Sequence, residues 1–304
     1  SQHTDETMEN PPPFSLNEAI RRWRAEFGSP SSLSAAELEE LTGTLSRTQE
    51  RITDSIRYAR MIQQSILPLP SDLTKNLAGS FTHLQPLDIV GGDYYFLEET
   101  EDGFFIGTVD CTGHGVPGAL MTMMSAALIS RIIEAAPDIT PAALLHTLHS
   151  QVQGILRTDT GSGFPENGLD IALCRVYPAE GRLIFAGAGL PLIISRNREI
   201  TWVPGDRVHL GFSSVRREIV FTDHAVETGR EDRVYLITDG ILDLPGGEQG
   251  YGLGRTGLLD LLAQTARLPL QEQKEELLSQ LTVYQGQWPS RDDLTIIGFV
   301  IRRE

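Results

Sequence analysis

The sequence predicts an α+β fold built on antiparallel β-sheets. From residue 80 onward, apolar segments with the alternation of strands follow one another in hairpin-like runs, and the helical segments come in separate blocks. The 304-residue chain also contains 29 glycines, which suits many turns and disfavours an all-helical fold. A doubly wound parallel sheet would need strands and helices to alternate, and they do not.

Three segments are expected along the chain. Residues 1–33 are expected to form an N-terminal segment that is disordered or contains a short helix, at 16–27. Residues 34–70 predict a helical linker, and residues 71–304 a single domain. Within that domain we expect strands at 81–87, 88–96, 104–110, 169–178, 182–189, 191–196, 234–244 and 292–302, and helices at 118–136, 141–156 and 255–284.

One long helix is expected over residues 34–67, where Ser34 and Glu37 have the spacing of a capping box. Apolar residues recur along it every 3.5 positions on average, with Gln49 and Gln63 interrupting the series. Its apolar members are Leu45, Ile52, Ile56, Ala59 and Ile66. The pattern fits a coiled coil or a helix docked on its own domain, and the sequence does not separate the two.

Charge and cysteine content restrict the partners and the compartment. The formal net charge of −16 disfavours nucleic acid and anionic membranes, because both are polyanions. Cys111 and Cys174 form no CxxC pair, so we expect buried, reduced thiols in a cytoplasmic protein. The uncharged run at 111–130 contains glycines and hydroxyl residues and makes a poor membrane span. Because the chain begins at Ser1 and not at Met, we expect a domain excised from a longer protein.

Five aspartates lie where apolar strand segments begin or end. They are Asp93, Asp110, Asp239, Asp292 and Asp293. Carboxylates at strand ends can meet at one edge of a sheet sandwich, where they repel one another. A hard divalent cation such as Mg²⁺ or Mn²⁺ removes that repulsion and prefers oxygen ligands. The pattern therefore predicts a metal site.

Each aspartate also has an ordinary explanation. Asp239 with Gly240 is a common turn pair, Asp292 could lie in a loop, and Asp93 could mark a bend. Asp110 is harder to dismiss, because the Thr-Gly-His-Gly stretch after it lets the backbone approach a ligand closely. His114 in that stretch is a candidate proton donor.

Other chemistries find less support. The sequence has neither a GxSxG elbow nor a GxxxxGK[ST] loop, which disfavours serine hydrolases and P-loop enzymes. His146 and His149 lie three residues apart on a predicted helix. They could ligate a metal, but we interpret them as a surface and a packing position.

Six motifs in order resemble the SpoIIE/RsbU-type PPM (PP2C-like) serine/threonine phosphatases, and more narrowly their bacterial sensor-linked, SiaA-like branch. The motifs occupy residues 90–96, 109–124, 168–174, 186–194, 237–247 and 292–298. The resemblance implies two stacked antiparallel sheets flanked by helices, with two divalent cations, Mg²⁺ or Mn²⁺, at one edge of the sandwich.

The resemblance also implies roles for the residues. Asp110 would bridge the metals, the Cys111 carbonyl would bind one of them, and Asp239 and Asp292 would bind the other. Asp93 would serve the second metal directly or through water, which makes Asp93 and Asp110 the candidate catalytic residues. Asp293, next to Asp292, is also a candidate metal ligand, although the family often has a different polar residue at that position. Many relatives have glycine in place of Cys111, and the arginine phosphate clamp of eukaryotic relatives has no counterpart here.

By the same resemblance, the expected function is hydrolysis of phosphoserine or phosphothreonine on a small STAS-like regulatory protein, of the anti-sigma-factor-antagonist type, by a metal-activated water. The resemblance also implies that the chain is the cytosolic effector part of a longer sensor protein, which could be membrane-anchored. From the apolar series we expect a homodimer through residues 41–67, with that linker setting the catalytic rate. Two alternatives stay open: a catalytically silent module that binds a phosphoprotein, and a purely structural dimerisation unit.

Overall fold

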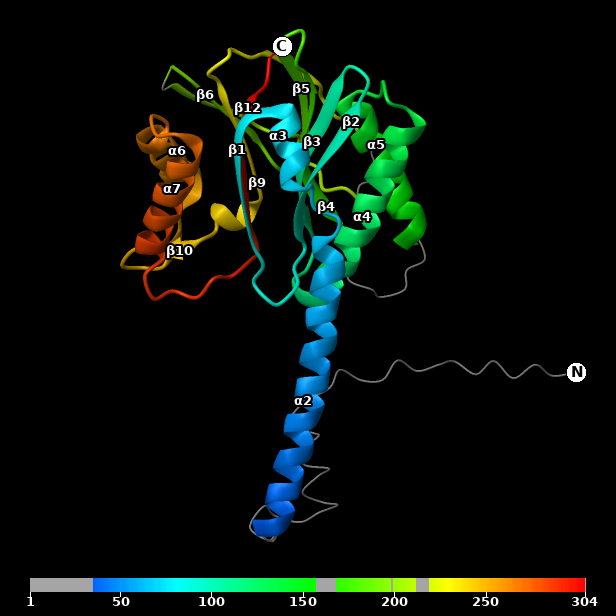
Figure 1. Ribbon diagram of the computed structural model, residues 1–304, viewed down its shortest axis with the longest axis vertical. Coiled ribbons are helices and arrows are strands. Elements are labelled where there is room, and N and C mark those ends of the chain that lie inside the picture. Colours follow the sequence, from blue (N-terminus) through cyan, green and yellow to red (C-terminus); the bar gives the residue numbers. More distant parts are fainter. Residues whose placement is uncertain (1–34, 157–167, 198, 212–218, 304) are drawn as a thin grey trace, which may run out of the picture. The chain divides into compact units, whose positions relative to one another are not determined.

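A computed structural model describes residues 35–156, 168–197, 199–211 and 219–303 of the chain (Figure 1). The chain divides into two compact units between Ser55 and Ile56. The expected helix at 16–27 and the capping residue Ser34 lie outside the described residues.

The linker segment is helical, as predicted. Helix α2 spans Ala35–Gln64 and is followed by a turn at residues 65–67. Its apolar positions are largely open to solvent in the first unit: Leu45 is 62% exposed and Ile52 is 56% exposed. The apolar series therefore has no partner among the described residues of that unit.

Two five-stranded antiparallel sheets form the second unit. The first has the strand order β1 (Leu77–Gln85), β12 (Leu294–Ile301), β9 (Arg233–Ile237), β6 (Leu192–Arg196) and β7 (Glu199–Val203). The second has the order β2 (Asp93–Thr100), β3 (Gly103–Cys111), β4 (Leu169–Tyr177), β5 (Arg182–Ala188) and β8 (His224–Glu227). The predicted α+β class with antiparallel sheets is confirmed.

The two sheets are stacked, and a pair of helices covers each outer face (Figure 1). Helices α4 (Gly115–Ala135) and α5 (Pro141–Leu156) pack on the second sheet, and α6 (Gly254–Thr265) and α7 (Leu270–Gln285) pack on the first. A third apolar cluster fills the space between the sheets, with Phe104, Phe185 and Phe299 fully buried. Burial on both faces explains why β3, β4 and β12 have near-continuous apolar sequences.

The structure corrects several predicted boundaries. The helix expected over 255–284 is two helices separated at residues 266–269, where Pro269 precedes α7 and cannot continue α6. The strand expected over 88–96 begins only at Asp93, and the one expected over 234–244 ends at Ile237. A short 3₁₀ helix, η3 (Asp239–Ile241), follows. The prediction also missed α3 (Pro70–Asn76), β7, β8 and the hairpin of β10 (Pro245–Gly246) and β11 (Tyr251–Gly252).

Helix α4 is the one described helix that is long and apolar enough to cross a membrane. Half of its most apolar stretch is buried inside the protein, where Leu128, Ile129 and Ile132 join the core under the second sheet. Core helices of soluble proteins show the same composition, so α4 is weak evidence for a membrane span.

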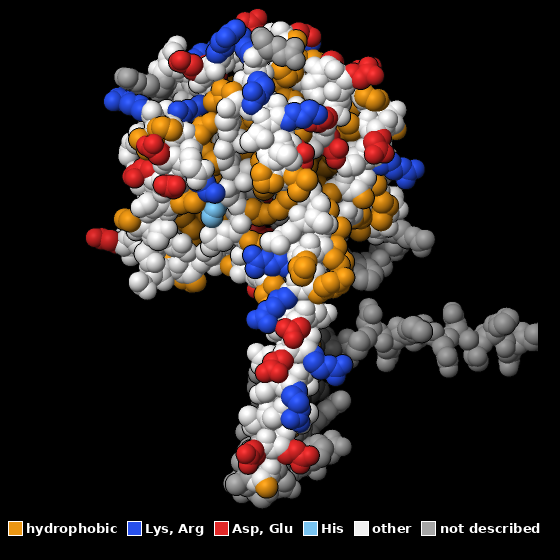
Figure 2. All heavy atoms as spheres, viewed as in Figure 1, with side chains coloured by type: hydrophobic (Ala, Val, Ile, Leu, Met, Phe, Trp, Pro, Cys, Tyr) orange, Lys and Arg blue, Asp and Glu red, His pale blue; other side chains and the backbone are white. Residues whose placement is uncertain are grey.

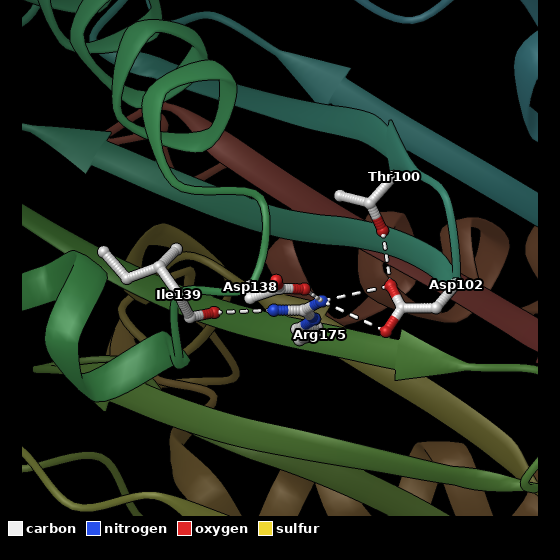
Figure 3. Close-up of polar contacts among 5 residues, drawn as sticks. All are labelled: Thr100, Asp102, Asp138, Ile139 and Arg175. Atoms are coloured by element: carbon white, nitrogen blue, oxygen red, sulfur yellow. Dashed lines mark hydrogen bonds and ion pairs between the residues drawn. The ribbon is translucent and has the colours of Figure 1, made fainter.

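A buried arginine anchors the loops at the end of β4 (Figure 3). The Arg175 side chain is 2% exposed; its Nη2 donates to Asp102 Oδ1 at 3.0 Å, and its Nη1 donates to the Ile139 carbonyl at 3.0 Å. The guanidinium also lies over the rings of Phe105 and Tyr177, at 5.2 and 4.9 Å from their centroids. One side chain thereby joins the β2–β3 turn to the α4–α5 connection.

We expect Arg175→Leu to destabilise the protein by about 2–4 kcal/mol, because it leaves the Ile139 carbonyl without this donor and removes packing from two rings. Urea unfolding measures the change. Arg182→Leu, at a more exposed arginine that also stacks on Tyr177, is the matched control. Equal stability of the two variants would show that the buried network contributes nothing.

Candidate metal centre

The register of the second sheet brings carboxylates together at one edge. Asp93 opens β2 and is paired with Asp110 near the end of β3, which in turn is paired with Asp170 at the start of β4. In the first sheet, β9 ends at Ile237, just before Asp239, and β12 starts directly after Asp293. Both sheets therefore deliver aspartates from strand ends, as the sequence pattern predicted.

A cavity of about 400 Å³ lies at this edge. Its walls combine residues at and just after the end of β3 with aspartates from three other places in the sequence. They are Asp110, Cys111, Thr112, Gly113, Leu169, Asp170, His209, Asp239 and Asp292. Three of the predicted metal-binding carboxylates, those of Asp110, Asp239 and Asp292, thus share one cavity.

Asp93 and Asp293 do not line this cavity but are buried behind it. Asp93 Oδ2 accepts hydrogen bonds from the hydroxyls of Thr238 and Thr295, both at 2.6 Å. Asp293 accepts from the backbone N–H groups of Leu87 at 2.6 Å and Gly92 at 2.5 Å. Both carboxylates therefore hold strand ends and the loop before β2 in place.

The two glycines before Asp93 are required by these close contacts. A Cβ atom on Gly91 would lie 2.6 Å from Asp293 Oδ2, and a Cβ atom on Gly92 would lie 2.4 Å from the Cys111 carbonyl oxygen. Only glycine allows the loop to approach both neighbours this closely.

Burial and mutual repulsion disturb the acidity of the cluster. Burial, followed by the charges of Asp93 and Asp239, raises the pKa of Asp110 well above its usual value. Burial also raises the pKa of Asp93, against the opposing effect of its two threonine hydrogen bonds. The pKa of Asp292 rises through burial and the charge of Asp239 as well. The raised pKa values favour protonation of these carboxyl groups when no cation balances their charge.

The donor set fits a hard divalent cation by its chemistry. Carboxylate oxygens of aspartates line the cavity, and they are atoms that can bind such a cation. One of them, Asp239 Oδ1, is buried with no hydrogen-bond partner among the described atoms. No three His, Cys, Asp or Glu side chains in the described ranges are arranged to hold an ion as they stand. Asp110 and Asp239 instead lie within hydrogen-bonding reach of each other. A cation between them would relieve the repulsion of the two carboxylates.

Cys111 reaches the cavity with its backbone. The Sγ atom is buried in the core and lies 3.6 Å from Ser125 Oγ on α4. Burial raises the pKa of the thiol, which keeps it protonated. Both cysteines are free and buried, as the sequence predicted.

We therefore expect Cys111→Ala to retain most of the phosphatase activity that the motifs imply, because only the carbonyl of this residue has been assigned a role. Turnover of an aryl phosphate, together with a melting curve to verify folding, measures the effect. A hundredfold or greater loss of activity in a folded variant would show that the thiol has a function, although its buried position indicates none.

Two residues of the cavity were missed by the sequence analysis. Asp170 lies opposite Asp110 on β4, and burial raises its pKa to about 6 despite the neighbouring histidine. His209 Nδ1 lies 2.6 Å from Asp170 Oδ1, and the exposed imidazole lines the cavity. The motif at 168–174 contained Asp170, but its position in an apolar strand gave no signal of its own.

The other histidines are placed largely as expected. His149 is buried, and its Nδ1 accepts a hydrogen bond from the Gly211 N–H at 3.0 Å, so it is a packing residue; His146 is exposed. His114 pairs with Asp88 at 2.7 Å, and this hydrogen bond raises the pKa of the imidazole. It does not line the cavity, so its expected role as a proton donor stays a prediction.

A known protein family matches most of this domain. The sequence profile described as "Stage II sporulation protein E (SpoIIE)" matches residues 100–302, about two thirds of the chain. The chain belongs to the SpoIIE family. A comparison with curated protein sequences finds no match.

Solved structures extend the likeness. The SiaA-PP2C domain of Pseudomonas aeruginosa is 38% identical, with a TM-score of 0.76, over 84% of this chain and 98% of that one. The phosphatase domain of SpoIIE from Bacillus subtilis (17% identity, TM-score 0.56) matches 74% of this chain and 62% of that one. The RsbU and RsbW domains of Rv1364c from Mycobacterium tuberculosis are 18% identical, with a TM-score of 0.58. The match covers 75% of this chain and 61% of that one. This SpoIIE-family chain therefore has the PP2C phosphatase fold, in its SiaA-like form, as its motifs indicated.

Proposed function

We propose that this SpoIIE-family chain is a metal-dependent protein serine/threonine phosphatase. The observation that carries the proposal is the shared cavity of Asp110, Asp239 and Asp292 at the sheet edge of a PP2C fold. Carboxylates crowded together at one site, where burial and mutual repulsion raise the pKa values of Asp110 and Asp292, are the arrangement expected of a site that binds metal.

In this proposal two divalent cations, Mg²⁺ or Mn²⁺, are held by Asp110, Asp239, Asp292 and the Cys111 carbonyl. When bound, such a pair supplies an activated water and balances the charge on the phosphoryl group. Asp93 and Asp293 position the ligands: Asp93 through Thr238, which precedes Asp239, and Asp293 through the N–H groups of the glycine loop. Asp170 fixes the imidazole of His209, which can then donate a hydrogen bond into the cavity.

Hydrolysis of p-nitrophenyl phosphate tests the proposal. We expect turnover in Mn²⁺, none in excess chelator, and none from Asp110→Asn. The rival is a catalytically silent phosphoprotein-binding module, which the absence of a ready-made ligand cluster among the described residues would allow. A folded wild-type protein that binds a phosphoprotein but never releases phosphate would replace our proposal with that rival.

For the natural substrate we propose a small regulatory protein carrying phosphoserine or phosphothreonine, of STAS-like fold. The resemblance to RsbU-type phosphatases supports this class, and so does the structural neighbour in which an RsbU domain occurs with an RsbW domain. We further propose that the chain works in the cytoplasm as the effector of a longer sensor protein. Phosphate release from a phosphorylated STAS-domain protein, compared with its unphosphorylated form, tests the substrate class.

We also propose that the chain dimerises through residues 41–67. The support is the row of exposed apolar residues on α2, including Leu45 and Ile52, whose burial would stabilise a coiled coil. Ile52→Glu with Ile56→Glu should give a monomer with altered turnover. Sedimentation and phosphatase kinetics measure the two effects. A monomer with unchanged kinetics would make the linker a tether, and a persistent dimer would place the interface elsewhere.

A further inference from the structure

A second, larger cavity of about 740 Å³ lies at the opposite end of the first sheet from the aspartates. Strand β9 begins at Arg233 on the wall of this cavity and ends at Ile237, close to Asp239. The other walls come from the end of β6, the loop before β9, and the connection between α6 and α7. The cavity is therefore separate from the proposed metal centre.

Arginines dominate the charge of this cavity. Arg230, Arg233 and Arg267 all line it. Within the described part of the chain, Arg230 and Arg267 have no ion pair or side-chain hydrogen bond, and Arg233 has no carboxylate partner. Such a concentration of positive charge is unexpected in a chain with a formal net charge of −16.

The acidic residues of the wall do not cancel this charge. Asp232 is buried and already neutralised: its Oδ2 accepts from Arg196 Nε at 2.9 Å and from the Gly229 N–H at 2.6 Å. Glu231 is exposed and is the other acidic residue on the wall. Three guanidinium groups thus face the cavity with one carboxylate to balance them.

Arg233 is held in place from behind. Its Nη1 donates to Gln273 Oε1 at 2.7 Å, and Gln273 is fully buried on α7. The Gln273 amide nitrogen donates to Tyr235 Oη at 2.9 Å and to Thr265 Oγ1 at 3.2 Å. The neutral amide of Gln273, itself held by hydrogen bonds, thus fixes the position of the Arg233 guanidinium. Because the amide carries no charge, the positive charge of Arg233 stays available for a ligand.

We propose that this cavity binds a small organic phosphate of mononucleotide size. Guanidinium groups match phosphate oxygens in geometry and charge, and the volume suits a small ligand. Ser195 and Asn197 add polar groups, and Leu270 and Val300 supply apolar wall for the organic part. Figure 2 shows several Lys and Arg side chains, with some Asp and Glu among them, at the end of the body where β6 lies.

Calorimetric titration of AMP into the full chain tests the site. Excess chelator is present, so that phosphate cannot be held by metal at the aspartates. Adenosine and inorganic phosphate are titrated in parallel. We expect AMP to bind, adenosine not to bind, and Arg230→Ala with Arg267→Ala to weaken AMP at least tenfold. Arg131→Ala, at an exposed arginine on α4, is the matched control and should leave binding unchanged.

Three outcomes would overturn the proposal: no binding of AMP at millimolar concentration, equal affinity in the double variant, or equal affinity for adenosine. Phosphate binding as tight as AMP binding would remove the organic part of the ligand from the proposal and leave a simple anion site. Because neither metal nor turnover enters the measurement, the result is independent of the proposed phosphatase activity.

Discussion

Asp110→Asn and Asp239→Asn are each expected to lower phosphatase turnover by about a thousandfold, equivalent to ~4 kcal/mol of activation free energy. The two carboxyl groups lie within hydrogen-bonding reach of each other in the shared cavity, and the buried Asp239 Oδ1 has no hydrogen-bond partner among the residues that the structure describes. An amide keeps the shape but supplies neither the negative charge nor the second oxygen that a divalent cation needs. Steady-state hydrolysis of an aryl phosphate in Mn²⁺ measures the loss.

The same substitution should not harm the metal-free fold. Because the pKa of Asp110 is raised on folding, the protonated carboxyl favours the folded state. Its contribution to stability is present below the unfolded pKa of 3.8 and is lost as the pH rises toward the folded value. In chelator, wild-type melting temperature should therefore fall between pH 5 and pH 8, and Asp110→Asn should reduce that fall.

Asp260→Asn, at an exposed aspartate on α6, is the control for both measurements. It should change neither turnover nor the pH dependence of melting. Near-normal turnover of Asp110→Asn in Mn²⁺ would contradict the assignment of the metal site. An unchanged pH dependence would contradict the repulsion within the cluster.

Gln63→Ala is expected to change turnover by about tenfold, ~1.4 kcal/mol, with little change in melting temperature. The Gln63 amide nitrogen, in the last turn of α2, donates to the Gly91 carbonyl at 2.6 Å and to Thr122 Oγ1 on α4 at 3.0 Å. Gly91 is packed against the carboxylate of Asp293, and the next N–H, of Gly92, donates to it. The last turn of α2 is thus joined by hydrogen bonds to the loop that precedes β2 and to α4.

Gln64→Ala is the matched control, because this neighbouring glutamine is exposed. If Gln63→Ala behaves like Gln64→Ala, the contact is structural only and the linker does not act through it. If Gln63→Ala changes turnover and Gln64→Ala does not, the glutamine at position 63 acts on the site through its hydrogen bonds to Gly91 and Thr122. Coiled-coil packing alone would not explain that effect.

The sequence predicted most of the fold, because strands buried on both faces and long apolar helices leave strong patterns. It failed where short elements depend on tertiary contacts. Strand β8 has four residues and pairs with β5 across a long connection, and β10 and β11 have two residues each. Pro269 divides a helical pattern that reads as continuous in the sequence.

The site was predicted from the aspartates at strand ends, and Asp110, Asp239 and Asp292 do share a cavity. Asp170 was missed because its proximity to Asp110 follows from the register of β3 against β4, which the sequence does not state. His209 was missed for a similar reason, since it lies 39 residues away in sequence from its partner Asp170. The sequence also does not show that Asp93 and Asp293 are buried behind the cavity wall, because their burial depends on how the strands pack in the folded protein.

The central claim is that this acidic cluster exchanges protons for two divalent cations. Calorimetric titration of Mn²⁺ at pH 7, repeated in two buffers of different ionisation enthalpy, tests it most directly. We predict two ions bound per chain with net release of protons, because Asp110 and Asp93 have raised pKa values in the metal-free protein. Asp110→Asn should bind fewer ions and release fewer protons. No binding by the folded wild type, or binding without proton release that Asp110→Asn leaves unchanged, would contradict the account.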